Sequence, residues 1–330
     1  MDDNQRIFIE QVKNFIEQKI AVRKDCLYIF QPFSIGDFFY AGGLSQAVQK
    51  RKNKSATVLV VKEHMKNLHV TYKNFAQILY LNNETMTAVQ NYFYLSGNYE
   101  ADNYIYGHFK PKAGGGWIVS DETIHLIDRY KKDVFNIPLN TPFVPPVVER
   151  ISAEDEQELE KRYALDRDRT IIISPYVHSS KQLPLTFWEN LVVHLKQRGC
   201  VVYTNTDGFS EQPVAGTEAI TTNFPQLYFV AGKIKCFVGS RNGVFDFLGM
   251  TKTKLVNINT FLDWLWDVSA LYPKSNNRTL YNAIDYISPV TEYFRKSGVT
   301  ATISLAHEKI RSSDIVYDYD TLLREILNSI

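Results

Sequence analysis

Short, continuous apolar runs that alternate with amphipathic segments are the feature of this sequence that most limits its fold. In the first half, three runs have the length and apolar content of fully buried strands: Cys26–Gln31, Thr57–Val61 and Phe75–Leu81. Residues 4–20, 44–52, 63–68 and 85–94 instead carry helical patterns, with apolar side chains three or four positions apart. Buried strands separated by helices need crossover connections, so the sequence predicts a parallel sheet with helices on both faces.

The second half repeats this alternation. Strand patterns cover residues 171–173, 200–205, 218–220, 235–240 and 254–258, with helical patterns over 152–163, 185–199 and 223–231 between them. Residues 140–148 are rich in proline and lack periodicity, which favours an extended linker. A chain of 330 residues is also long for one core. We therefore expect two tandem doubly wound, Rossmann-like α/β domains, 1–147 and 148–330. An amphipathic helix over 320–330 is a candidate to pack back on the first domain.

Composition excludes several classes of protein. Lys and Arg number 37 against 36 Asp and Glu, so the net charge of +1 provides no basic surface for nucleic acid. No apolar run approaches the length of a membrane span, and the acidic, polar N-terminus is unlike a secretory signal. The isolated cysteines Cys26, Cys200 and Cys236 lie in or beside strand-like runs and are expected to be structural thiols. We expect a cytoplasmic protein.

Three polar loops follow predicted strands and are the candidates for a binding site. They are Gly36-Asp37 after the first strand, Ser179-Ser180-Lys181-Gln182-Leu183-Pro184 after the first strand of the second domain, and Ser240-Arg241-Asn242-Gly243. Open α/β sheets bind ligands beyond the carboxyl ends of their strands. A loop rich in hydrogen-bond donors that leads into a helix N-terminus is suited to a phosphate group.

Taken in this order, the three loops resemble those of the heptosyltransferase family, which has the GT-B fold with two domains around a cleft. The Ser-Arg-Asn-Gly turn, with Asp246 after it, is also similar to a turn in GT-B fucosyltransferases. The chain departs from the heptosyltransferase pattern at Leu183 and Arg241, where that family usually carries an aromatic and an acidic residue. The resemblance therefore implies glycosyl transfer as a class of reaction rather than one particular sugar.

Asp37 is the candidate catalytic residue. The resemblance gives the matching aspartate the role of general base, which takes the proton from the acceptor hydroxyl as that hydroxyl attacks the anomeric carbon. The alternative interpretation is that Asp37 only caps a helix beginning at Phe38. Gly36 before it permits close approach of the backbone to a ligand.

The second domain carries the candidates for donor binding. Lys181 and Arg241 would stabilise the charge of the leaving diphosphate, although a solvated lysine and an ordinary ion pair are the alternative interpretations. Hydrogen bonds to the diphosphate are expected from Ser179, Ser180, Ser240, Asn242 and Gly243, and nucleoside or sugar contacts from Tyr176, Thr204, Asn205 and Asp246. We expect no cofactor and no metal, because the one Asp-x-Asp pair, Asp318 and Asp320, precedes a helix that it can cap.

The sequence thus predicts an inverting, metal-independent glycosyltransferase that uses a nucleotide-diphosphate sugar. The acceptor would be a glycan, a lipid-linked oligosaccharide or a glycoprotein. A lipid-linked acceptor would fit peripheral association with the inner face of a membrane. The region Tyr99–Tyr106 with Trp117 is the candidate acceptor surface, because aromatic rings stack on sugars. Two alternatives stay open: a catalytically degenerate GT-B partner subunit and a GT-B nucleotide-sugar epimerase.

Overall fold

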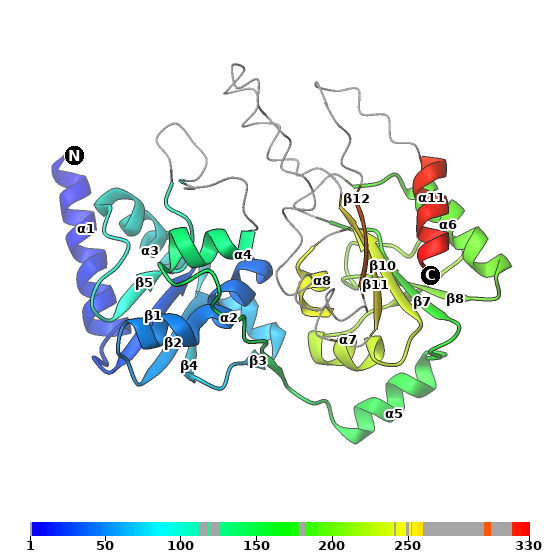
Figure 1. Ribbon diagram of the computed structural model, residues 1–330, viewed down its shortest axis with the longest axis horizontal. Helices are drawn as coiled ribbons and strands as arrows, with labels where there is room; N and C mark the ends of the chain where they lie inside the picture. The colour runs from blue at the N-terminus through cyan, green and yellow to red at the C-terminus, as the bar shows by residue number, and fades with distance from the viewer. Residues whose placement is uncertain are drawn as a thin grey trace, which may run out of the picture. The chain divides into compact units, whose positions relative to one another are not determined.

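The computed structural model describes residues 2–111, 118, 126–177, 182–240, 242–248, 251, 253–259, 300–304 and 319–330. The chain divides into two compact units, Met1–Glu149 and Arg150–Ile330 (Figure 1). Each unit contains its own parallel sheet and its own hydrophobic core. Among the helices in the described ranges, none combines the length and the apolar character that a membrane crossing requires.

The first unit is built on a four-stranded sheet in the order β4-β2-β1-β5. Its strands are β1 (Cys26–Gln31), β2 (Ala56–Lys62), β4 (Phe75–Leu81) and β5 (Tyr104–Tyr106), and every pairing is parallel. The sequence predicted the first three. It did not predict β5, because three residues within an irregular stretch carry no readable periodicity.

Helices cover both faces of this sheet. One face of β1, with Tyr28 and Phe30, packs against α3 (Asn83–Ser96) and against the π-helical turn η1 (Ile16–Ile20) that ends α1 (Asp3–Phe15). The opposite face, with Leu27 and Ile29, is buried beneath α2 (Ile35–Arg51). The unit is completed by η2 (Glu63–Leu68), α4 (Leu126–Arg129), η3 (Tyr130–Val134) and an antiparallel pair of β3 (Val70–Thr71) with β6 (Val147–Val148).

The second unit contains a six-stranded parallel sheet in the order β12-β11-β10-β7-β8-β9. Its strands are β7 (Thr170–Ser174), β8 (Val201–Asn205), β9 (Glu218–Ile220), β10 (Cys236–Ser240), β11 (Lys254–Asn259) and β12 (Thr300–Ser304). Helix α5 (Ala153–Arg162) opens the unit, and α7 (Phe224–Ala231) and α8 (Gly243–Leu248) follow β9 and β10. Phe237 of β10 meets Phe245 of α8 edge to face, with 5.4 Å between ring centroids.

The C-terminal helix α11 (Tyr319–Ser329) belongs to the core of the second unit. Its apolar residues Leu322 and Ile326 are buried beside those of α6 (Leu185–Gln197), and Arg198 Nη1 donates a 2.5 Å hydrogen bond to the carbonyl of Leu327. The apolar face of this helix is therefore used within the second unit. Burial also raises the pKa of the Cys236 thiol to about 12, as expected of a structural cysteine.

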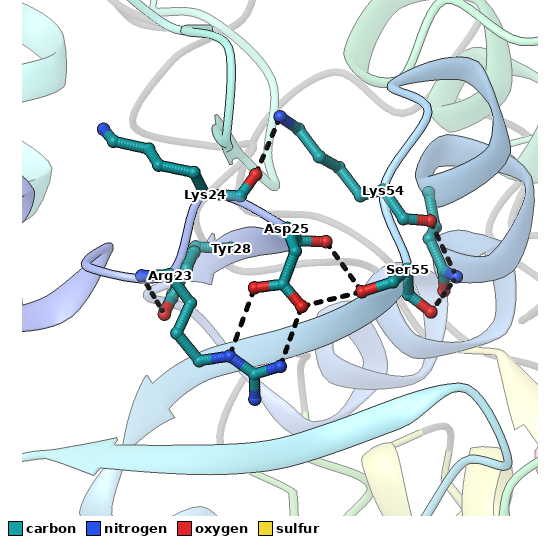
Figure 2. A network of polar contacts seen from close by, with 7 residues as sticks. Arg23, Lys24, Asp25, Tyr28, Lys54 and Ser55 are labelled. Carbon is teal, nitrogen blue, oxygen red and sulfur yellow. Dashed lines mark hydrogen bonds and ion pairs between the residues drawn. The ribbon is translucent and has the colours of Figure 1, made fainter.

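The amino ends of β1 and β2 are joined by a polar network (Figure 2). The carboxylate of Asp25 accepts hydrogen bonds from Arg23 Nη2 at 2.8 Å and from Ser55 Oγ at 2.9 Å. Ser55 N–H and Lys54 Nζ donate to the carbonyls of Asp25 and Lys24, at 2.8 and 3.0 Å. Because ligands of open α/β sheets bind at the opposite, carboxyl ends, this network is structural: it fixes the register in which the two strands start.

Strand order gives each sheet one switch point. From β1 the chain continues to β2 on one side, while β5 lies on the other side of β1. In the second sheet the chain runs from β7 to β8 and β9, and then returns to place β10 on the other side of β7. Loops that leave neighbouring strands in opposite directions open a crevice between them. The expected binding positions are thus the carboxyl ends of β1 and β5 and those of β7 and β10.

Candidate functional site

Asp37 lies in the first turn of α2, directly after β1. The helix begins at Ile35, three residues before the expected start at Phe38, so Gly36 and Asp37 are helical and do not form a loop. Ser34 is the N-cap residue, and Asp37 Oδ2 accepts hydrogen bonds from its backbone N–H at 3.2 Å and its Oγ at 2.8 Å. These contacts form a capping box, in which Asp37 occupies the third helical position and is not itself the N-cap.

The other oxygen of Asp37 faces two side chains that are distant in sequence. Tyr130 OH donates a 2.5 Å hydrogen bond to Oδ1, and His108 Nε2 lies 3.6 Å from the same oxygen. His108 follows β5, so the three residues meet at the switch point between β1 and β5. The Asp37 side chain is 19% exposed, whereas His108 and Tyr130 are buried. The carboxylate is therefore the solvent-accessible member of a buried polar cluster.

Aromatic rings fix the two buried partners of Asp37. The ring of Phe33 lies on His108 with 3.9 Å between centroids and 34° between planes. Tyr40 stacks on Tyr130 at 4.5 Å and 8°, and Phe109 meets Tyr130 at 4.7 Å and 61°. Stacked and tilted rings at these distances leave little freedom of rotation. The hydroxyl of Tyr130 is thus held toward Oδ1.

The same burial decides how the cluster is protonated. Burial lowers the pKa of His108 below its usual range, and the negative charge of Asp37 only partly opposes the shift. Burial raises the pKa of Tyr130 well above its usual range, and the charge and hydrogen bond of Asp37 raise it further. At neutral pH His108 is therefore neutral and Tyr130 keeps its proton, so the hydroxyl remains a hydrogen-bond donor.

Tyr130 and His108 were not identified as site residues from the sequence. Tyr130 stands 93 positions from Asp37, in a segment with no recognisable motif. His108 is one polar residue in an aromatic stretch, and only its place after β5 distinguishes it. A correct prediction of β5 would have provided the missing signal, because the residues after two neighbouring parallel strands lie close together.

In the second unit, the loops after β7, β8 and β10 are joined by hydrogen bonds. Tyr176 OH donates to the carbonyl of Gln212 at 2.5 Å, and Asn242 Nδ2 donates to the carbonyl of Tyr176 at 3.4 Å. Asn242 Oδ1 also accepts from the N–H of Val244, so Asn242 caps the helix that begins at Gly243. Two of the predicted donor-binding residues, Tyr176 and Asn242, thus meet at the switch point between β7 and β10.

Three further candidates lie at the same edge of the sheet. Ser240 ends β10 and is fully buried, and its hydroxyl has no hydrogen-bond partner in the described part of the chain. Thr204 is also fully buried, with its hydroxyl bonded to Thr217 Oγ1 at 2.6 Å and to the N–H of Val214 at 3.1 Å. Asn205 is the half-buried last residue of β8. The Thr204 hydroxyl therefore already makes two hydrogen bonds that hold the loop after β8.

The remaining predicted donor-binding residues lie outside the described residues: Ser179, Ser180, Lys181, Arg241 and the side chain of Asp246, whose backbone belongs to α8. In the described ranges, no group of three or more His, Cys, Asp or Glu side chains is arranged to hold a metal ion.

The expected acceptor surface is corrected in part. Tyr104 and Tyr106 are buried core residues, packed with Phe93 and Phe30, because β5 is a strand of the sheet and not a surface segment. Tyr99 is half-buried, and its ring lies 5.3 Å from Lys110 Nζ. Trp117 lies outside the described residues.

Comparisons with known proteins find similarity of structure and not of sequence. No protein-family model matches the chain, and no curated protein matches it in sequence. The structure of ADP-heptose LPS heptosyltransferase II from E. coli superposes with a TM-score of 0.55 at 12% identity, over 92% of this chain and 98% of the other. A glycosyl transferase of family 9 from Veillonella parvula gives a TM-score of 0.51, also at 12% identity, over 71% and 80%. The chain therefore has the GT-B type of α/β fold, with two Rossmann-like domains.

Proposed function

We propose that the protein is a glycosyltransferase in which Asp37 is the general base. The observation that carries this proposal is the position of Asp37: a partly exposed carboxylate in the first turn after β1, at the switch point of the first sheet. The fold adds support, because two solved structures of similar fold are named as glycosyl transferases. Such a carboxylate is what the attacking hydroxyl of an acceptor needs.

The proposed reaction inverts the anomeric carbon. As the acceptor oxygen attacks, its proton passes to Asp37 Oδ1 and a new glycosidic bond forms on the face opposite the leaving group. The bond between the anomeric carbon and the diphosphate oxygen breaks, and its electron pair leaves with the nucleoside diphosphate.

We assign the leaving diphosphate to the second unit. Lys181 and Arg241 would stabilise its developing charge, with hydrogen bonds from Ser179, Ser180, Ser240, Asn242 and Gly243, and no metal would be needed. The support for this assignment is the strand order, since β7 and β10 are neighbours at the switch point and these residues come at the end of β10 or after one of the two strands in the sequence. Tyr176, Thr204, Asn205 and Asp246 are assigned to the nucleoside or the donor sugar.

ADP-heptose is the first donor to test, because it is the donor named for the E. coli protein of similar fold. The acceptor in this proposal is a glycan, a lipid-linked oligosaccharide or a glycoprotein. A lipid-linked acceptor would bring the protein to the cytoplasmic face of a membrane as a peripheral enzyme.

The proposal is tested by thermal-shift measurements with sugars activated by ADP, UDP, GDP, CMP and dTDP, followed by an assay for released nucleotide. At a ligand concentration of one hundred times Kd, binding to the native state adds about 2.7 kcal/mol of stability, which moves the melting temperature by several degrees. The proposal predicts such a shift with at least one donor, and slow release of its nucleoside diphosphate. Absence of both with every donor would contradict it.

A further inference from the structure

Tyr130 contributes one of the three hydrogen bonds that hold the Asp37 carboxylate. We propose that Tyr130 is a positioning residue for Asp37, holding Oδ1 in the orientation in which it receives the acceptor proton, a role that rests on the proposed function. The role goes beyond helix capping. The Ser34 capping box is completed by Oδ2 alone, so the helix end does not require the bond from Tyr130 to Oδ1.

The hydrogen bonds leave one direction of approach to the carboxylate. Each oxygen offers about two lone pairs. Oδ2 accepts two hydrogen bonds from Ser34, and Oδ1 accepts one from Tyr130. Among the described residues, the other group near Oδ1 is His108 Nε2, which at 3.6 Å is beyond direct hydrogen-bond distance. The second lone pair of Oδ1 is therefore the position at which a substrate hydroxyl can bind.

Tyr130 is suited to this role because it can neither rotate away nor lose its proton. Its side chain is 1% exposed and is enclosed by Tyr40 and Phe109. Burial keeps the hydroxyl protonated far above neutral pH. Among the described residues, the titratable groups that face Asp37 are Tyr130 on η3, His108 after β5 and Tyr106 on β5. Of these three, Tyr130 is the one that donates a hydrogen bond to the carboxylate, at 2.5 Å.

The first test is kinetic and uses the full-length chain with a donor found by the thermal-shift screen. Tyr130→Phe keeps the ring but removes a hydrogen bond to a charged group, so kcat should fall about 10- to 100-fold with donor affinity unchanged. An unchanged kcat would overturn the proposal.

A matched control separates this role from general stability. Tyr92 is another fully buried tyrosine of the first unit, with its hydroxyl 3.2 Å from that of Tyr104. Tyr92→Phe removes a buried hydroxyl of the same kind, so it should lower the melting temperature while kcat stays at the wild-type value. Equal kinetic losses in Tyr92→Phe and Tyr130→Phe would show a structural effect and overturn the assignment.

A second readout needs no substrate, so the inference can fail separately from the proposed function. In protein with ¹³C-labelled aspartate, the carboxyl resonance of Asp37 is identified by its loss in Asp37→Asn. Tyr130→Phe should shift this resonance, whereas Tyr92→Phe should not. A resonance unaffected by Tyr130→Phe refutes the positioning role even in an active enzyme. A shifted resonance in a protein that releases no nucleotide refutes the proposed function and leaves the contact established.

Discussion

At the scale of single residues, the two oxygens of Asp37 have different partners. Oδ2 belongs to the capping box with Ser34, whose spacing of three residues is a helix-start signal that the sequence carries openly. Oδ1 faces Tyr130 and His108, which come from elements far along the chain. Local sequence could therefore predict the cap. The partners that make Asp37 a candidate base depend on tertiary structure.

His108 should make folding stability dependent on pH. Burial places its pKa in the folded state below 6.5, the ordinary value that it regains on unfolding, so the unfolded chain binds more protons between the two values. Stability contributed by neutral His108 is complete above pH 6.5 and is lost as the pH falls below it. For one proton, the free energy of unfolding changes by at most about 1.4 kcal/mol per pH unit.

This dependence can be measured as the melting temperature between pH 7.5 and 5. Wild type should lose stability more steeply toward acid than His108→Gln, which cannot titrate. His194→Gln, at an exposed position on α6, is the control and should keep the wild-type slope. Identical slopes in wild type and His108→Gln would show that His108 is not held neutral.

Lys181 is the residue on which the donor assignment most depends. Loss of a charge-assisted hydrogen bond to a phosphate should weaken donor binding by about 10- to 100-fold in Lys181→Ala. The measurement is calorimetric titration with the donor found by thermal shift. Lys196→Ala, which removes an exposed lysine from α6 of the same unit, is the matched control and should bind normally. Donor affinity that survives Lys181→Ala contradicts the diphosphate assignment.

At the scale of elements, the apolar pattern predicted most strands and helices to within a few residues. Fully buried strands such as β1 and β7 can be predicted from the sequence because their central residues form a continuous apolar run. Gly199, expected near the end of α6, follows it with a φ of +78°. Four strands were missed: β3, β5, β6 and β12. The first three have two or three residues, and these pair because of the surrounding fold and not because of any local preference.

Helix α2 owes its close packing to glycine. A Cβ added at Gly43 would lie 2.1 Å from Cε2 of the buried Phe143 ring, and the carbonyl of Gly43 accepts a hydrogen bond from Val144. Helix propensity alone predicts that Gly43→Ala stabilises the protein by about 1 kcal/mol. The collision predicts the opposite sign, a loss of about 1–3 kcal/mol.

Urea denaturation decides between these two signs. Gly43→Ala should lower the midpoint, and the same substitution in a Phe143→Ala background should be neutral or stabilising, because the ring that it meets is gone. A Gly43→Ala protein more stable than wild type would mean that the ring moves aside at no cost, and the packing described for α2 would then be wrong.

At the scale of the whole molecule, the alternation of strands and helices was sufficient to predict two doubly wound α/β units, and the likeness to the E. coli structure agrees. Strand order was not readable from the sequence, since periodicity says which residues are buried but not which strands are neighbours. The proposed function depends on the strand order, because this order makes β1 and β5, and likewise β7 and β10, neighbours at a switch point.

The measurement that tests this account most directly is the rate of nucleoside diphosphate release by wild type and by Asp37→Asn, with donor affinity measured on both. Asp25→Asn is the matched control, since Asp25 precedes β1 at the opposite end of the strand and serves the network of Figure 2. The account predicts that Asp37→Asn is slower by about 100- to 10,000-fold with unchanged donor affinity, while Asp25→Asn keeps the wild-type rate. Equal rates for wild type and Asp37→Asn would contradict it.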